Sequence, residues 1–260
     1  MADPIQFTDG AGYERYMGKW SQLAGKAFLD WLAAPTGWRW LDVGCGNGAF
    51  TEMIVGQCAP ESVHGIDPSD AQLCFARSRP QTRGVEFRQG SAMALPYGDR
   101  AFDAAVMPLV IVFLPDPAKG VREMSRVVRS GGGVAAYMWG QADGGFPYHT
   151  LQAEMAALGA EVLTPPSPEA ARVDTMEELW TAAGLRDIST HQVTVERTFT
   201  DFDEYLTTIR SSPSLGRALA AMSATDVARL EERLRRLLSA DAEGRITYSA
   251  RANCVKGWVR

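Results

Sequence analysis

Two aspartates in the first third of the chain stand where α/β proteins hold nucleotide-like ligands. The stretch RWLDVGCGNGAF, from Arg39 to Phe50, places Asp42 just before a turn that contains Gly44 and Gly46. Glycine adopts positive φ angles and lets a ligand approach the backbone closely. Asp67 ends the next apolar run, SVHGID, about 20 residues after the turn, the separation at which a carboxylate accepts hydrogen bonds from ribose hydroxyls. The spacing predicts a nucleoside cofactor at this turn.

Asp42 discriminates between two classes of cofactor. Gly44, Gly46 and Ala49 match the G-x-G-x-x-A pattern of dinucleotide-binding proteins, which is a weak signal alone. A carboxylate beside the turn repels a pyrophosphate but attracts a cofactor that carries a sulfonium and an ammonium group. In the structural alternative, Asp42 only satisfies amides of the turn and Asp67 is a solvated strand end. An NAD-type oxidoreductase is the competing hypothesis, although no Tyr-x-x-x-Lys pair is present for hydride chemistry.

These residues need a scaffold, and strand and helix patterns alternate from Trp38 to about Gly140. Short apolar runs that end in Gly or Asp are separated by stretches with apolar residues at helical spacing, which predicts a parallel sheet covered on both faces. Helix caps are expected at Ser69 or Asp70 and at Asp174 or Thr175. We expect strands at 38–44, 62–67, 85–90, 102–107 and 133–140, and a helix from 116 that ends at the glycines 131–133.

The remainder of the chain predicts accessory elements around that sheet. Residues 1–37 are helical in pattern and form a separate lid segment ahead of a domain that spans 38–260. Within this domain, residues 141–170 and 202–240 read as cap or substrate insertions. The alternation at 189–199 and 245–259 predicts two further strands.

Four segments, taken in order, resemble the successive motifs of class I S-adenosylmethionine-dependent methyltransferases. They are LDVGCGNG, GIDPSDAQLCFAR, FRQGSAMALPYGDRAFDAAVM and REMSRVVRSGGGVAAYMW. They are most similar to the ubiquinone/menaquinone-methyltransferase-like subgroup, and the resemblance covers residues 38–140. It implies a doubly wound, mostly parallel seven-stranded α/β sheet of the Rossmann-like methyltransferase type with a helical cap. It also implies S-adenosylmethionine as cofactor, S-adenosylhomocysteine as product and a small-molecule methyl acceptor.

The resemblance also assigns the cofactor to residues at the strand ends. The glycine turn lines the methionine moiety, Asp67 binds the ribose, and the loop after the fourth strand passes near the methionine end. Ser91 stands where an acidic residue commonly faces the adenine, so this contact falls to Ser91 or its neighbours. The residues assigned to the cofactor are Tyr16, Trp20, Asp42, Gly44, Cys45, Gly46, Asn47, Asp67, Pro68, Ser69, Ser91, Ala92, Met93, Pro108 and Leu109.

Three candidate roles each compete with a structural interpretation. Tyr13, Tyr16 and Trp20 share one helix face, which suits a lid over the cofactor and core packing equally well. His149, in GGFPYHT after the fifth strand, is the candidate general base by residue type; the alternative is a surface histidine. Cys45 fits a small filler of the turn better than a nucleophile, because nothing in the sequence marks a lowered pKa.

Composition narrows the classes of partner. The 260 residues carry a net charge of -5 and no basic groove, which argues against nucleic acid, and no apolar run is long enough to span a membrane. The four cysteines lack a CxxC pair and the three histidines lack metal-ligand spacing, so we expect a cytoplasmic protein without disulfides or a metal. A monomer and a homodimer both remain open, as do a protein substrate and a non-catalytic S-adenosylmethionine-binding module.

Overall fold

A seven-stranded sheet forms the centre of the computed structural model, which describes residues 14–141, 143–212 and 215–260. The strand order is β3-β2-β1-β4-β5-β7-β6. The first five strands are parallel, and β7 runs antiparallel to both β5 and β6. The strands are β1 (Arg39–Val43), β2 (Ser62–Asp67), β3 (Glu86–Gln89), β4 (Phe102–Pro108), β5 (Val128–Trp139), β6 (Arg186–Phe199) and β7 (Ile246–Trp258).

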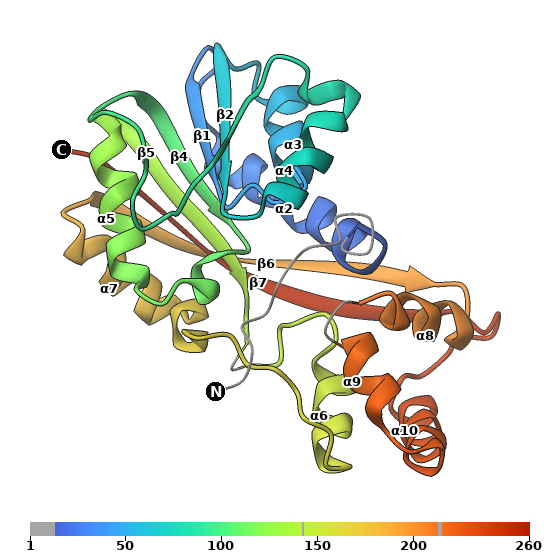
Figure 1. The fold of residues 1–260 in the computed structure, drawn as a ribbon. Helices are drawn as coiled ribbons and strands as arrows, with labels where there is room; N and C mark the ends of the chain where they lie inside the picture. The colour runs from blue at the N-terminus through green and yellow to red at the C-terminus, as the bar shows by residue number, and fades with distance from the viewer. Residues whose placement is uncertain (1–13, 142, 213–214) are drawn as a thin grey trace.

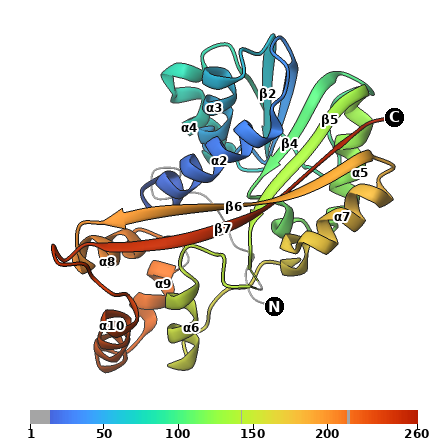
Figure 2. The same ribbon diagram turned by 180° about the vertical axis from the view of Figure 1, so that it is seen from behind.

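Helices cover both faces of this sheet, as the alternating sequence pattern predicts. Helices α2, α3 and α4 lie on one face and α5 and α7 on the other (Figures 1 and 2). The α-helices are α2 (Lys19–Leu32), α3 (Ala49–Gln57), α4 (Asp70–Ser78), α5 (Pro117–Val127), α6 (His149–Ala157), α7 (Val173–Ala182), α8 (Phe202–Arg210), α9 (Leu215–Ala221) and α10 (Ala224–Leu237). Short turns of helix are η1 (Glu14–Gly18), η2 (Pro80–Thr82), η3 (Ile111–Phe113) and η4 (Pro168–Ala171).

The chain changes direction across the sheet between β1 and β4, where β2 and β3 extend to one side and β5 to the other. In open α/β sheets ligands bind beyond the carboxyl ends of the strands at such a switch point. The strands β1 and β4 are almost completely buried there. The topology therefore brings the ends of β1, β2 and β4 together at one edge.

A second body of helices lies at the far end of the two longest strands. Strands β6 and β7 run beyond the others, and α6, α8, α9 and α10 gather around their extension (Figure 1). The expected insertion at 202–240 is thus a set of three helices. Leu230 and Leu234 of α10 are fully buried, while Leu237 at its end is 53% exposed.

Two local expectations were wrong. Helix α5 ends at Val127 and the chain enters β5 directly, so the glycines 131–133 belong to a strand and do not end the helix. Gly132 is needed there because a Cβ on it would lie 2.5 Å from the carbonyl oxygen of Asp103. Helix α7 begins after Arg172 with no side-chain cap, because Asp174 instead pairs with the Arg172 guanidinium at 2.6 Å. At α4 the expected cap is confirmed, since Ser69 Oγ accepts from the amide of Gln72.

Candidate functional site

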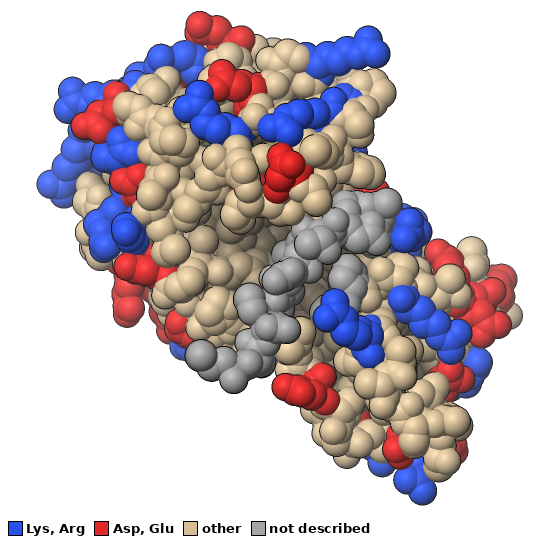
Figure 3. All heavy atoms as spheres, viewed as in Figure 1, with Lys and Arg blue, Asp and Glu red and all other residues tan. Residues whose placement is uncertain are grey.

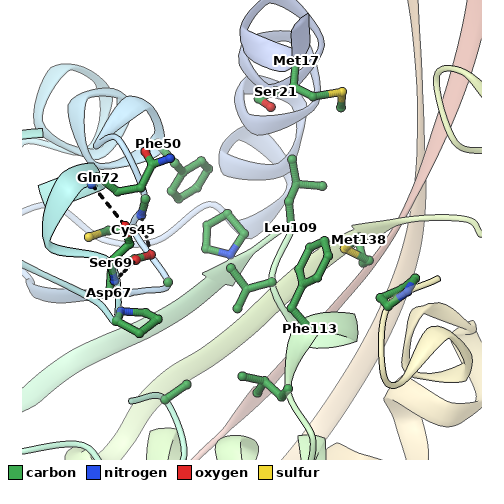
Figure 4. A pocket seen from close by; sticks show the side chains of 18 of the residues that line it. Met17, Ser21, Cys45, Phe50, Asp67, Ser69, Gln72, Leu109, Phe113 and Met138 are labelled. Carbon is green, nitrogen blue, oxygen red and sulfur yellow. Dashed lines mark hydrogen bonds between the residues drawn. The ribbon is translucent and has the colours of Figure 1, made fainter. Parts of the chain in front are cut away.

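A cavity of about 670 Å³ lies at the carboxyl ends of β1 and β4, beneath the first helices of the chain. The face viewed in Figure 3 is hollowed between the sheet and the helical cap, and acidic and basic side chains are mixed around it. Figure 4 shows two sides of the cavity, with Asp67 and Ser69 on one side and Phe113 and Met138 on the other. We call the side with Asp67 and Ser69 the cofactor half, after the sequence prediction, and the side with Phe113 and Met138 the acceptor half.

The glycine turn has the conformation that its sequence requires. Gly44 and Gly46 have φ angles of +74° and +51°, a region that side chains rarely adopt. A Cβ on Gly44 would lie 2.4 Å from Val110 Cγ2, whereas a Cβ on Gly46 would meet no atom within 4 Å. Gly44 therefore permits close packing of two loops, and Gly46 leaves open space where a ligand can approach the backbone.

Asp67 is fixed against this turn. Its carboxylate accepts hydrogen bonds from the Gly46 amide at 2.9 Å and from the Ser69 amide at 2.8 Å. Burial raises the pKa of Asp67, and the two amide hydrogen bonds oppose that shift. The carboxylate is thus held in one orientation at the edge of the cavity, with remaining lone pairs available to ligand hydroxyls.

Asp42 is fully buried beneath the turn, and only one of its two carboxylate oxygens has a partner among the described residues. Thr51 Oγ1 donates to Oδ2 at 2.6 Å, while Oδ1 has no hydrogen-bond partner within 14–141, 143–212 and 215–260. Burial raises the pKa of Asp42 to about 7, and the nearby charge of Asp67 raises it further against the opposing Thr51 bond. A buried acceptor of this kind fits a ligand ammonium group and does not fit a phosphate.

The loop after β4 completes this side of the cavity. Leu109 has a positive φ of 60°, a strained conformation for a branched side chain. Its amide donates to the carbonyl of Tyr137 at 2.8 Å, which holds the loop against β5. Pro108 and Leu109 both line the cavity, as the sequence predicts.

The predicted adenine side also lines the cavity. Ser91, Ala92 and Met93 border it next to Pro68 and Ser69. Ser91 Oγ accepts from the Met93 amide at 3.2 Å, so this hydroxyl helps to shape the turn. No acidic side chain takes its place among the described residues that line the cavity there.

Cys45 lines the cavity but packs into a small apolar cluster behind the turn. The cluster consists of Cys45, Leu73, Ala76 and Phe87. Burial raises the pKa of the Cys45 thiol well above its ordinary value, which keeps it protonated. The thiol is a packing element and not a nucleophile.

The two aromatic residues predicted for the lid occupy different places. Tyr16 lines the cavity and stacks on Tyr148, with ring centroids 4.6 Å apart. Trp20 is fully buried, does not line the cavity, and donates from Nε1 to the Tyr148 hydroxyl at 3.2 Å. That hydroxyl in turn donates to the Tyr16 carbonyl. Tyr13, the third residue of the predicted face, lies outside the described residues.

An ionic network that sequence reasoning missed joins the first helical turn to the glycine turn. Glu14 Oε2 accepts from Asn47 Nδ2 at 2.9 Å and from Arg79 Nη2 at 2.7 Å. Arg79 also donates to the Asn47 carbonyl and to Glu52. Only long sequence separations connect these groups, so no local pattern could reveal them. Asn47 thereby anchors η1, the segment that carries Tyr16 and Met17 of the cavity lining.

Comparison with known proteins agrees with this geometry. Residues 41–136, which carry Asp42, the glycine turn, Asp67 and Leu109, match the model of a family described as a methyltransferase domain. This region is a methyltransferase domain. A demethylmenaquinone methyltransferase of Desulfitobacterium hafniense is 35% identical over 118 residues, which are 43% of this chain and 46% of the relative.

Two further similarities agree with this assignment of residues 41–136, and their coverage limits what can be transferred from these proteins to this chain. A 2-methyl-6-phytyl-1,4-hydroquinone methyltransferase of Oryza sativa is 40% identical over 94 residues, 36% of this chain and 27% of the relative. The structure of a Haemonchus contortus phosphoethanolamine N-methyltransferase with S-adenosylhomocysteine superposes with a TM-score of 0.58 at 20% identity, covering 96% of this chain and 56% of that one. The chain thus spans less than half the length of the two curated relatives.

These similarities confirm the resemblance to class I S-adenosylmethionine-dependent methyltransferases, and two of the similar proteins are named for methylation of a quinone or a hydroquinone. They also confirm the Rossmann-like fold class, with β7 as the antiparallel member of the seven-stranded sheet. No group of acidic, histidine or cysteine side chains within the described ranges could hold a metal ion. Among the described helices, none is long and apolar enough to cross a bilayer.

The acceptor half of the cavity differs in chemistry from the cofactor half. Its wall is mainly apolar and comes from η3, β5 and the connections around α6. Asp42 and Asp67 are the charged side chains among the described residues that line the whole cavity. The residues of the acceptor half are Met17, Ser21, Phe113, Leu114, Pro115, Met138, Trp139, Gln141, Phe146, Gln152, Leu163 and Pro165.

The two predicted substrate regions contribute unequally to this wall. Gln141, Phe146 and Leu163 come from the insertion at 141–170, whereas no described residue of 202–240 lines the cavity. His149 is exposed at the start of α6 and is absent from the lining. Its neighbour one turn along, Gln152, faces the cavity instead, and we assign His149 no part in the reaction proposed below.

Proposed function

We propose that the protein transfers a methyl group from S-adenosylmethionine to a small, uncharged and largely apolar acceptor. The observation that carries this proposal is a single cavity with two unlike halves. One half presents Asp42 and Asp67 beside a glycine turn, and the other offers apolar walls without a charged side chain among the described residues. A cationic cofactor and an apolar acceptor can therefore meet inside one enclosed space.

The chain supplies the binding groups of the cofactor half. Asp67 is positioned for ribose hydroxyls, the open space at Gly46 admits the ligand beside the backbone, and the unpartnered Oδ1 of Asp42 suits an ammonium group. When bound, S-adenosylmethionine supplies a methyl group already activated by a positively charged sulfur. The residues around it need only fix its orientation and exclude water.

The acceptor half contributes orientation and not proton transfer. No histidine, lysine, glutamate or arginine is among its described lining residues, and the Cys45 thiol stays protonated in the other half. An aliphatic amine arrives protonated near neutral pH and has no base here to accept its proton. A phenolic or enolic oxygen keeps lone pairs while its own proton is still bound, and it can release that proton to water when the methyl group is transferred. Such an oxygen, or a ring carbon conjugated to one, is therefore the favoured nucleophile. The hydroquinone and demethylmenaquinone names of two relatives agree with that class.

An anionic acceptor is disfavoured by the same lining. Transfer of an ion from water into a protein interior without a partner of opposite charge costs roughly several kcal/mol. The two aspartates of the cofactor half would add repulsion. Carboxylate and phosphate acceptors are therefore outside the proposed class.

The competing functions make different predictions. An NAD-type oxidoreductase would bind nicotinamide dinucleotides, which Asp42 opposes with its buried unpartnered oxygen. A non-catalytic module would bind S-adenosylmethionine but never produce S-adenosylhomocysteine. As part of this proposal we place the protein in the cytoplasm, supported by four free cysteines, and expect it to act as a monomer or homodimer, away from nucleic acid.

The test is calorimetric titration with S-adenosylmethionine, S-adenosylhomocysteine and NAD, followed by product detection with a panel of phenols and hydroquinones. Binding of the first two ligands together with methylation of a panel member supports the proposal. Binding without turnover of any acceptor supports the non-catalytic module. NAD binding without binding of either sulfur cofactor would overturn the proposal.

A further inference from the structure

Two glutamines provide side-chain amides in the acceptor half that have no hydrogen-bond partner among the residues that the structure describes. Gln141 follows β5 directly, and Gln152 lies on α6. Both line the cavity. Neither side chain makes a hydrogen bond within the described residues, whereas the hydroxyl-bearing residues Ser21 and Tyr16 of the same cavity interact elsewhere in the protein. Trp139 Nε1 is also buried without a hydrogen-bond partner among the described residues, but it can only donate. The two amides are thus the available side-chain groups that can both donate to and accept from an acceptor.

Hydrogen bonds tie down the glycines that precede and follow Gln141 in the chain. The Gly140 amide donates to the Arg251 carbonyl at 2.9 Å, and the Gly145 amide donates to the Gly140 carbonyl at 2.7 Å. A Cβ on Gly145 would lie 2.5 Å from the Arg251 carbonyl oxygen, so this close loop depends on glycine. Gln141 thus follows directly on a glycine whose amide is bound to the neighbouring strand β7.

Gln152 is connected to the segment that covers the cofactor. The backbone N–H of Gln152 donates to the Tyr148 carbonyl at 3.0 Å within the first turn of α6. Tyr148 is itself held by stacking on Tyr16 and by hydrogen bonds with Trp20 and the Tyr16 carbonyl. The side chain of Gln152 therefore faces the cavity from a helix end that the first helices anchor.

A carboxamide offers both a donor and an acceptor but carries no charge. It can pair with a hydroxyl or a carbonyl oxygen, and it cannot neutralise a buried carboxylate or phosphate. In a chamber whose other walls are apolar, such groups fix the orientation of a ring and reject a charged analogue. The amides thus match an uncharged oxygen-bearing acceptor.

We propose that Gln141 and Gln152 are the specificity-determining residues of the acceptor half, which orient an uncharged acceptor by hydrogen bonds to its oxygen atoms. This inference rests on the proposed methyl transfer for the identity of the neighbouring ligand. The two glutamines are positioning residues, because they neither donate nor remove a proton in the reaction. Their effect is on which acceptor binds and how its nucleophilic atom faces the cofactor.

The test is titration of two probes into protein already saturated with S-adenosylhomocysteine. Naphthol and naphthoic acid share one ring system and differ in charge near neutral pH. We expect naphthol to bind and naphthoic acid to bind at least about tenfold more weakly, because its carboxylate has no cationic partner. Gln152→Leu and Gln141→Leu should each lower the affinity for naphthol by about tenfold, because each variant loses one buried hydrogen bond to the probe.

Two further variants separate an orienting role from a structural one. Gln152→Arg introduces a cation and should invert the preference, so that naphthoic acid binds more tightly than naphthol. Gln57→Leu changes an exposed glutamine at the end of α3 and should change neither affinity. The affinity of S-adenosylhomocysteine itself, measured separately, should stay within about twofold in all four variants.

Each outcome bears on a different proposal. Unchanged naphthol affinity in both leucine variants, equal binding of the two probes by the wild type, or binding of neither probe would overturn the role of the glutamines. In all these cases retained S-adenosylhomocysteine binding and turnover of another acceptor would leave the proposed function standing. Absence of S-adenosylhomocysteine binding in the wild type would overturn the proposed function itself.

Discussion

The two halves of the cavity are built from the chain in opposite ways. The cofactor half comes mostly from residues 42–109, at the ends of consecutive parallel strands, and its groups are fixed by short-range hydrogen bonds such as Ser69 to Asp67. The acceptor half gathers Ser21 from α2, Phe113 from η3, Met138 from β5 and Gln152 from α6. The comparison indicates that local sequence encodes recognition of a constant ligand, while recognition of a variable one depends on distant segments packed around it.

The largest expected effect is in the cofactor half, at Asp67. Asp67→Ala removes the acceptor of two backbone amides, and with it the proposed ribose contact, so cofactor affinity should fall on the order of a hundredfold. Calorimetric titration with S-adenosylhomocysteine measures the change. Asp70→Ala, an exposed carboxylate on the same segment, is the matched control and should keep full affinity. Equal loss in both variants would show that the charge of the region, and not the Asp67 contact, holds the ligand.

Asp42 should make the cofactor half sensitive to pH. The folded protein retains a proton on Asp42 up to about pH 7, whereas the unfolded chain loses it near the ordinary value of 3.8. The ligand-free protein therefore loses stability as the pH rises between these values, by about 4 kcal/mol if nothing else compensates. A ligand ammonium favours the carboxylate, so cofactor affinity should rise over the same window and level off above about pH 7.

Thermal unfolding with and without S-adenosylhomocysteine, at about pH 6 and about pH 8, measures both effects. Asp42→Asn preserves the shape and removes the titration. It should flatten both profiles and weaken the cofactor by about tenfold at the higher pH. Profiles of the variant that still follow the wild type would assign the pH dependence to another group.

A moderate effect confined to the acceptor half is expected at Phe113. Phe113→Ala removes part of the apolar wall that Phe113 and Met138 form on the acceptor side of the cavity (Figure 4). We expect the KM of an accepted phenol to rise by about tenfold, since about 1.5 kcal/mol of ring contact is lost, while cofactor affinity stays within about twofold. Phe75→Ala, on α4 and outside the cavity lining, is the control. A parallel loss of cofactor affinity at Phe113 would break the division into halves.

The smallest effect should come from the network that joins the halves at their edge. Glu14→Gln weakens a partly exposed ion pair with Arg79 and should lower stability by about 0.5 to 1 kcal/mol. If the pair also holds the covering segment closed, S-adenosylhomocysteine should dissociate about threefold faster in stopped-flow experiments. Asp30→Asn removes an exposed pair with Lys26 on the same segment and should change neither quantity. Loss of stability with an unchanged dissociation rate would make Glu14 a structural residue alone.

Much of the scaffold could be predicted from the sequence, because buried parallel strands leave continuous apolar runs that end at recognisable residues. Strand β2 begins and ends where the pattern SVHGID predicts, and β7 lies within the predicted last strand. The predicted end of α5 failed because glycines 131–133 also suit a strand that another backbone approaches closely. Only the carbonyl of Asp103, on a different strand, decides between these two uses of glycine.

The sequence by itself determined the cofactor half. Asp42, Gly44, Gly46 and Asp67 lie at strand ends, and the handedness and short connections of parallel strands leave little freedom in where those ends meet. Residues that bind a ligand from these strand ends can therefore be predicted from their spacing in the sequence alone.

Only the tertiary structure decided the acceptor half and the roles of its candidates. It placed Tyr16 in the cavity and Trp20 behind it, and it turned Gln152 inward and His149 outward from one helix end. Such choices depend on which face of a helix packs against residues more than a hundred positions away, as Tyr148 does against Tyr16 and Trp20. Packing energies of this kind have no local sequence signature, because each partner is only an ordinary apolar or aromatic residue in its own segment.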